Sequence, residues 1–280
     1  WYHAGLHWTT ERNRMGILEA LALYLGLGAV AGTLAGLFGI GGGLIIVPAL
    51  VFAYGWQGVS GSISAHLAVG TSLATVVFTS LSSIRTHHGK GAVRWELFRP
   101  MAAGILLGAA LGAVTAGLLS GEMLQGIIGV FVLLVAAKMV TGWSPMASDR
   151  QPAKAELGGV GGGIGWLSAI VGIGGGTLTV PYLTWVGVRM QHAVGTSAAC
   201  GLPIAVSGAL TNMVVGWGRE GLPEYSVGFV FLPALLGIVL MSVPFARVGA
   251  LLAHRLDERW LKRLFALLLV VIGVRFLISG

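Results

Sequence analysis

Charged side chains are scarce in this chain of 280 residues: Asp, Glu, Lys and Arg make up 10% of it, whereas hydrophobic residues make up 55%. A soluble domain carries about 25% charged residues. The shortage excludes a soluble globular protein and indicates an integral membrane protein, whose partner is the lipid bilayer. The formal charge of +7 then reports which loops face the cytoplasm, not a nucleic-acid partner.

Cysteine and clustered metal ligands are also lacking. Cys200 is the single cysteine, which excludes an internal disulfide, and no Cys/His cluster has metal-ligand spacing. No nucleophile–base pair stands out, and the glycine run at residues 39–43 lacks the Lys-Ser/Thr ending of a nucleotide-binding loop. We therefore expect neither an enzyme nor a resident metal or cofactor.

Carboxylates are nearly absent from the apolar segments. Glu19 lies near the start of the first segment, and the other acidic residues lie in or beside loops. A site for a hard cation needs oxygen ligands of this kind. The deficit favours an anion as the ligand.

Glycine, in contrast, is abundant at 46 residues, which suits close packing of membrane helices better than the alternating strands of a barrel. We expect an all-α polytopic membrane protein. Residues 1–16 are an N-terminal extension, 17–140 a first membrane repeat, 141–157 a polar linker and 158–280 a second membrane repeat. Each repeat holds five apolar segments: 17–38, 44–54, 64–81, 101–119 and 123–140, then 158–170, 177–186, 191–215, 229–250 and 262–277.

The two halves share their motifs. Gly-Ile-Gly-Gly-Gly at residues 39–43 returns at 172–176, and each copy is followed by Val-Pro. Ala-Val-Gly-Thr-Ser at 68–72 returns at 193–197. Tandem duplication is the economical explanation.

Loop charges indicate that the two halves are inverted. The basic loop 82–99 should be cytoplasmic and its equivalent, 216–228, outside; the acidic turn 120–122 should be outside and its equivalent, 247–263, cytoplasmic. Inversion requires an odd number of crossings in each half, which five segments supply. Both chain termini are then predicted outside.

Segments 44–54 and 177–186 are too short to span a bilayer, which takes about 20 residues. Each begins at a glycine run. Paired short, Gly/Pro-interrupted segments in two inverted halves point to the central site of a transporter. They predict broken or re-entrant helices at the two Gly-Ile-Gly-Gly-Gly motifs.

A helix that restarts after a glycine run presents unpaired N–H groups and a partial positive charge, and glycine lets an anion approach the backbone closely. Removing a charge from water costs several kcal/mol, whereas one charge-assisted hydrogen bond returns about 1.5–3 kcal/mol, so we expect both repeats to meet at one shared site. The alternative is that the glycines serve close helix packing only. The predicted anion-binding residues are Gly41, Gly42, Gly43, Thr71, Ser72, Gly174, Gly175, Gly176, Thr177, Thr196 and Ser197.

Three further residues lie in or near the Ala-Val-Gly-Thr-Ser segments. His66 and His192 could carry a proton, since histidine titrates near neutral pH; a structural role is the alternative. Cys200 could line the site, or it could be a small buried hydrophobic residue.

The paired glycine runs with Val-Pro and the two Ala-Val-Gly-Thr-Ser segments resemble the TauE/SafE family of membrane transporters, over residues 17–277. This family includes sulfite exporters and organosulfonate permeases. The resemblance implies a secondary transporter of sulfite or an organosulfonate in a bacterial inner membrane, with protons as a possible coupling partner. A passive anion channel, or a transporter of thiosulfate, sulfate or a carboxylate, is the alternative. Oligomeric state is not indicated.

Overall fold

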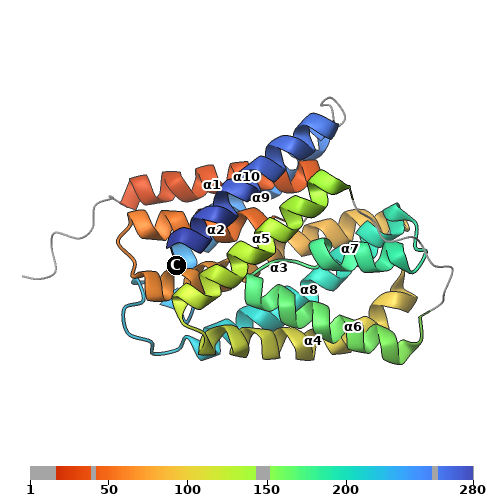
Figure 1. The fold of residues 1–280 in the computed structure, drawn as a ribbon, viewed down its shortest axis with the longest axis horizontal. Helices are drawn as coiled ribbons and strands as arrows, with labels where there is room; N and C mark the ends of the chain where they lie inside the picture. Colours follow the sequence, from red (N-terminus) through yellow and green to blue (C-terminus); the bar gives the residue numbers. More distant parts are fainter. Residues whose placement is uncertain (1–16, 39–41, 143–151, 254–257, 280) are drawn as a thin grey trace, which may run out of the picture.

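The computed structural model describes residues 17–38, 42–142, 152–253 and 258–279. Within these ranges, all the long elements are helices (Figure 1), which confirms the expected all-α class. The first half contributes α1 (Ile17–Phe38), α2 (Gly43–Trp56), α3 (Gly61–Gly89), α4 (Trp95–Leu118) and α5 (Gly121–Thr141). The second contributes α6 (Lys154–Val171), α7 (Gly176–Trp185), α8 (Met190–Val215), a hairpin of β1 (Ser226–Val227) and β2 (Val230–Phe231), α9 (Leu232–Ala253) and α10 (Glu258–Ser279).

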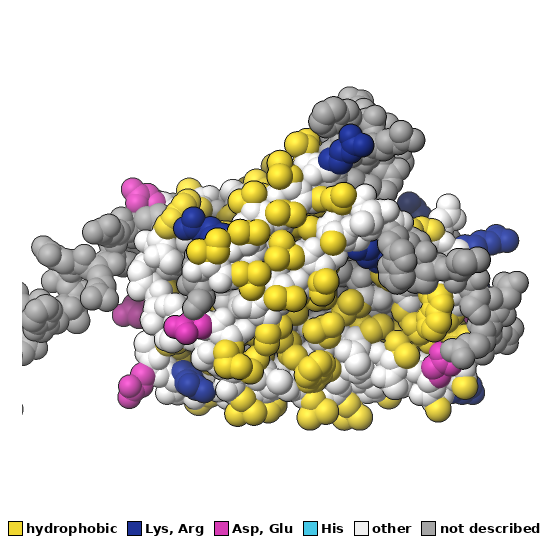
Figure 2. All heavy atoms as spheres, viewed as in Figure 1, with side chains coloured by type: hydrophobic (Ala, Val, Ile, Leu, Met, Phe, Trp, Pro, Cys, Tyr) yellow, Lys and Arg dark blue, Asp and Glu magenta, His cyan; other side chains and the backbone are white. Residues whose placement is uncertain are grey.

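The molecule is an integral membrane protein. Among the described residues, α3, α4, α5, α8 and most of α9 are long and apolar enough to cross a membrane. Large hydrophobic side chains lie on their outer faces: Leu107 of α4 is 70% exposed and Leu134 of α5 is 64% exposed. Figure 2 shows hydrophobic side chains across the middle of one face of the molecule, with charged side chains towards its two ends. Such a face is suited to lipid.

The short helices α2 and α7 each run back alongside the preceding helix. Each therefore finishes at the end of the molecule where that preceding helix begins. The Tyr24 hydroxyl near the start of α1 donates to Oε1 of Gln57, directly after α2, at 2.8 Å. Likewise, the Tyr182 hydroxyl of α7 donates to Oε1 of Glu156 in the first turn of α6, at 3.4 Å. The α1–α2 and α6–α7 pairs are therefore helical hairpins, and they enter from opposite ends (Figure 1).

Glycine makes these reversals possible. Gly172 ends α6 with φ 74° and Gly42 precedes α2 with φ 78°, and both values lie in the left-handed region that glycine adopts without strain. The other part of the first reversal, residues 39–41, lies outside the described residues, as do the N-terminal extension and most of the linker.

The two halves interlock through close helix packing. α6 lies along α4, with their backbones nearly touching: a methyl group added at Gly165 would lie 2.5 Å from the carbonyl oxygen of Ile105, and one added at Gly161 would lie 2.6 Å from that of Met101. α1 lies along α9 in the same way, with Gly28 against the backbone of Ile238. A helix of each half is thus packed against a helix of the other half through small residues.

The two ends of the molecule differ in charge (Figure 2). We call the end where α3 finishes and α4 begins the basic end, and the opposite end the acidic end. The described acidic end carries Glu19, Glu122, Glu220 and Glu224 with Arg219 and Arg275. The described basic end carries Glu96 and Glu156 with Arg85, Lys90, Arg94, Arg99, Lys138, Lys154, Arg189, Arg247 and Arg263. The excess of Lys and Arg predicts that the basic end is cytoplasmic.

Cysteine labelling tests this orientation. Lys90→Cys and Glu220→Cys, each made with Cys200→Ala, place one thiol at an exposed position of each end. In intact cells, a membrane-impermeant maleimide should label Glu220→Cys, and it should label Lys90→Cys only after permeabilisation, because the basic end is predicted inside. The reverse pattern would invert the assignment.

Candidate functional site

A cavity of about 290 Å³ lies between the two halves. Its walls come from α1, α2, α3, α8 and α9, and from the beginning of α7. Gly42, which precedes α2, borders it, and so do Gly174, Gly175 and Gly176 at the beginning of α7. Two glycine motifs that are far apart in the sequence thus face one space.

The two motifs are also in direct contact beside this cavity. A methyl group added at Gly43 would lie 2.9 Å from the carbonyl oxygen of Gly172 and 2.9 Å from Cα of Ile173. The Ser72 hydroxyl donates to the carbonyl oxygen of Gly172 at 2.7 Å. This hydroxyl of the first half therefore positions the glycine motif of the second.

The beginnings of α2 and α7 supply positive potential to the cavity. The first N–H groups of a helix have no acceptor within that helix, and a helix N-terminus carries about half a positive charge. At α7, the carbonyl of Gly175 accepts from the N–H of Thr179 at 2.8 Å. The N–H groups of the preceding residues, from Gly176 onwards, are left for other acceptors.

Hydroxyl groups line the part of the cavity that lies between the beginnings of α2 and α7 and the basic end. Ser197, one of the predicted residues, is among them. Ser242 of α9 also lines the cavity; it is buried, and its hydroxyl has no hydrogen-bond partner among the described residues. The remaining hydroxyls come from the second half of α3: Thr79, Ser80, Ser82, Ser83 and Thr86.

At the basic end, His87 of α3 and Arg247 of α9 line the cavity. The positive charge there is that of Arg247. No carboxylate is among the described residues that line this space. A cleft lined by one sign of charge attracts ions of the opposite sign, so the arrangement favours entry of an anion from this end.

The sequence motifs did not predict Ser80, Ser242, His87 or Arg247 as cavity residues. The sequence shows a cluster of Ser and Thr around residues 79–86, but the predicted apolar segment ends at residue 81, before Ser82, Ser83 and Thr86. In the structure α3 continues to Gly89, which carries these hydroxyls along the cavity wall.

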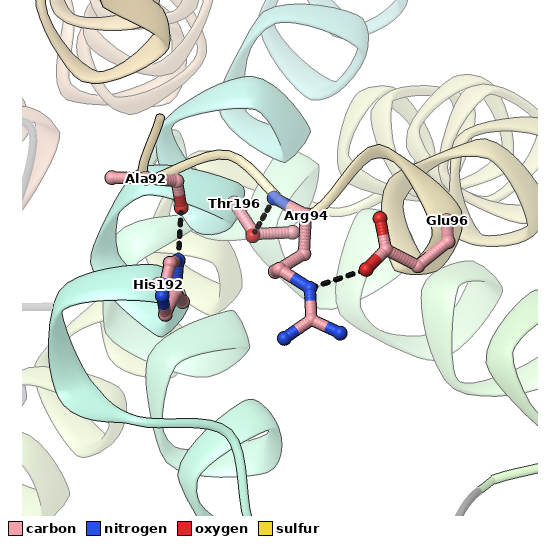
Figure 3. A network of polar contacts seen from close by, with 5 residues as sticks. All are labelled: Ala92, Arg94, Glu96, His192 and Thr196. Atoms are coloured by element: carbon pink, nitrogen blue, oxygen red, sulfur yellow. Dashed lines mark hydrogen bonds and ion pairs between the residues drawn. The ribbon is translucent and has the colours of Figure 1, made fainter. Parts of the chain in front are cut away.

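Thr71 and Thr196 do not line the cavity. Oγ1 of Thr71 accepts from the backbone N–H of Phe231 at 3.0 Å and from the Tyr54 hydroxyl at 3.3 Å. Oγ1 of Thr196 accepts from the backbone N–H of Arg94 at 2.9 Å (Figure 3). Both hydroxyls are thus engaged by loop backbone.

Thr177 and Gly41 were also predicted to bind the anion. Thr177 lies in the first turn of α7, and its buried hydroxyl has no partner among the described residues. Gly41 lies outside the described residues. An anion-binding role for either of them stays a prediction.

His66, His192 and Cys200 are absent from the lining of the cavity. Nε2 of His66 lies 3.1 Å from the carbonyl oxygen of Ala116, and Nδ1 of His192 lies 3.2 Å from that of Ala92. Cys200 is fully buried in α8. The geometry therefore gives both histidines a structural contact, and a proton-carrying role stays a prediction.

Comparison with known protein families gives a match over most of the chain. The family model described as Sulfite exporter TauE/SafE matches residues 24–276. The chain belongs to the TauE/SafE family. It is therefore a membrane transporter of the TauE/SafE type. No solved structure matches it.

Three individual relatives match over almost their whole length. A "Probable membrane transporter protein" from Haemophilus influenzae is 39% identical over 262 residues, which cover 92% of this chain and 98% of that protein. One from Methanocaldococcus jannaschii is 26% identical over 263 residues, which cover 93% and 97%. YunE of Bacillus subtilis, also a probable membrane transporter protein, is 24% identical over 278 residues, which cover 91% and 96%.

Proposed function

We propose that this transporter moves a small sulfur-containing anion, sulfite or an organosulfonate, across a bacterial inner membrane by alternating access. The observation that best supports this proposal is that Gly42 of the first half and Gly174, Gly175 and Gly176 of the second half border the same cavity. The substrate class rests on the family, whose model is described as a sulfite exporter.

The anion lies against the beginnings of α2 and α7. Each helix N-terminus contributes about half a positive charge, so the two together balance about one negative charge. Charge-assisted hydrogen bonds from their N–H groups return about 1.5–3 kcal/mol each, and several are needed to offset the loss of hydration. The unpartnered hydroxyl of Ser242 adds a donor, whereas the Ser197 hydroxyl, which also lines the cavity, donates to the carbonyl oxygen of Val194 at 2.9 Å.

The two halves act as inverted repeats that rock about this site. The hairpins α1–α2 and α6–α7 enter from opposite ends (Figure 1). α3 and α8 are antiparallel, because Leu73 lies near Gly208 whereas Ser80 lies near Gly201. Three helices of each half, and not five segments as predicted, then run between the two ends: α3, α4 and α5 in the first half and α8, α9 and α10 in the second. Three is also an odd number, as inversion requires. The cavity opens towards the basic end, which corresponds to a cytoplasm-facing state.

A binding screen tests the substrate class. Purified protein is titrated with sulfite, sulfate, thiosulfate, small sulfonates and carboxylates, and we expect sulfite or a sulfonate to bind most tightly. Ser242→Ala should weaken this binding about tenfold, because it removes one hydrogen bond to a charged group. Ser62→Ala removes a hydroxyl at the acidic end, away from the cavity lining, and should bind normally. Preference for a carboxylate, or unchanged affinity in Ser242→Ala, would contradict the proposal.

Flux measurements in proteoliposomes test the mechanism. A transporter shows saturable anion flux, and coupling to protons would make that flux respond to an imposed pH gradient. A flux that rises without saturation and ignores the gradient would instead indicate a passive anion channel.

A further inference from the structure

Two connecting segments lie deep in the molecule, one at each end. At the acidic end, the β1–β2 hairpin between α8 and α9 buries Phe229, Val230 and Phe231, which are 2%, 0% and 9% exposed. At the basic end, the turn between α3 and α4 runs from Lys90 to Arg94 and buries Val93. Both segments contact helices of the other half.

The first Ala-Val-Gly-Thr-Ser segment holds the hairpin. Oγ1 of Thr71 accepts from the N–H of Phe231 at 3.0 Å. The preceding residue, Gly70, has the carbonyl of Phe229 directly against its Cα, so that any Cβ there would overlap this oxygen. Glycine lets the hairpin backbone approach and threonine fixes it by a hydrogen bond.

The second Ala-Val-Gly-Thr-Ser segment makes the same contact at the other end. Oγ1 of Thr196 accepts from the N–H of Arg94 at 2.9 Å (Figure 3). A methyl group added at Gly195 would lie 2.7 Å from the carbonyl oxygen of Ala92. Each copy of the motif is therefore a docking site for a connecting segment of the opposite half. We call the Gly70–Thr71 and Gly195–Thr196 pairs the two sockets.

The two ends differ in what adjoins the socket: an aromatic cluster at the acidic end and the cavity at the basic end. At the acidic end, the Phe231 ring packs edge-to-face on Tyr24 and on Tyr54, at 6.0 Å between ring centroids in each case. The Tyr54 hydroxyl donates to Thr71 at 3.3 Å, so the aromatic cluster and the socket form one unit. At the basic end, the cavity extends to His87 and to the exposed Arg247.

We propose that the hairpin 226–231 is the gate at the acidic end of the transport path, and that Thr71 is the positioning residue that holds it closed. The inference rests on the proposed alternating access, because a site that faces both sides in turn must open at the acidic end. Opening requires the Phe231 N–H to leave Thr71 and its ring to leave Tyr24 and Tyr54. Thr196 makes the equivalent bond without closing the cavity.

Cavity accessibility from the acidic side tests the gate. Ala198→Cys, made with Cys200→Ala, places a thiol in the cavity lining. With the acidic end accessible in right-side-out vesicles, Thr71→Val should raise the rate of labelling by an impermeant thiol reagent about three- to tenfold, the effect of losing one hydrogen bond. Thr71→Ser keeps the acceptor and should restore slow labelling. Thr196→Val removes the matching bond at the basic end and should leave the rate unchanged.

A labelling rate that Thr71→Val leaves unchanged in folded protein would overturn the gate. If that variant does not fold, Tyr54→Phe removes the hydrogen bond that joins the aromatic cluster to Thr71 and keeps the bond from the Phe231 N–H, so a smaller increase in the labelling rate is expected. An equal increase in Thr196→Val would also overturn it, because general loosening would then explain the effect. Labelling needs no substrate, so a failure of the sulfur-anion proposal in the binding screen stays distinguishable from a failure of the gate.

Discussion

Gly175→Leu is expected to reduce anion flux at least about 100-fold, because it blocks about two of the charge-assisted hydrogen bonds at the start of α7. A Cβ at this position would lie 3.0 Å from the carbonyl oxygen of Ser197 and 3.1 Å from the backbone nitrogen of Gly201. The rest of the side chain must then occupy the cavity or displace α8. Flux of sulfite or a sulfonate into proteoliposomes, normalised to the reconstituted protein, measures the loss.

The control for this variant is Gly159→Leu. Gly159 lies on α6 and has open space where a Cβ would project, so leucine there should leave flux at the wild-type level. Gly175→Ala provides an intermediate step, because a methyl group tightens the contact with Ser197 without filling the cavity. Wild-type flux in folded Gly175→Leu would show that the glycine motif is not part of the binding site.

Gly165→Leu is expected to prevent assembly of the two halves. A Cβ at Gly165 would lie 2.5 Å from the carbonyl oxygen of Ile105 and 3.0 Å from the backbone nitrogen of Ala109. Overpacking against movable side chains already costs about 1–3 kcal/mol, and here the opposing atoms are backbone. We expect little or no monodisperse protein in size-exclusion chromatography.

The matched control lies on the same helix. Gly163 is two residues away, and a Cβ there would meet open space. Gly163→Leu should therefore elute and melt like the wild type, although both variants add the same side chain to α6. If Gly165→Leu also elutes as a single species with an unchanged melting temperature, the close α4–α6 packing does not hold the halves together.

The Ala-Val-Gly-Thr-Ser segments show how far a motif can be interpreted without a structure. Their repetition predicted that Thr71 and Thr196 bind an anion, whereas in the structure each accepts a backbone N–H of a connecting segment. Glycine beside a hydroxyl was interpreted as a place for a ligand. The same pair of residues serves equally well where a backbone must approach closely, and sequence alone does not distinguish a ligand from a loop.

The cavity shows the opposite case, in which residues without a conspicuous motif become part of a candidate site. Ser80 and Ser242 stand in unrelated sequence surroundings on α3 and α9. They line one cavity because the helices that carry them border the same space. No local sequence pattern predicts that Ser80 and Ser242 border the same cavity.

The sequence by itself determined that the protein is helical and lies in a membrane, and it located the two short segments at the glycine runs. Those properties depend on composition and on local backbone freedom. The tertiary structure alone decided that α2 and α7 turn back, that Gly43 meets Gly172, and that each connecting segment docks on the opposite half. These outcomes depend on contacts between distant parts of the chain, because close packing of backbones selects partners by three-dimensional shape.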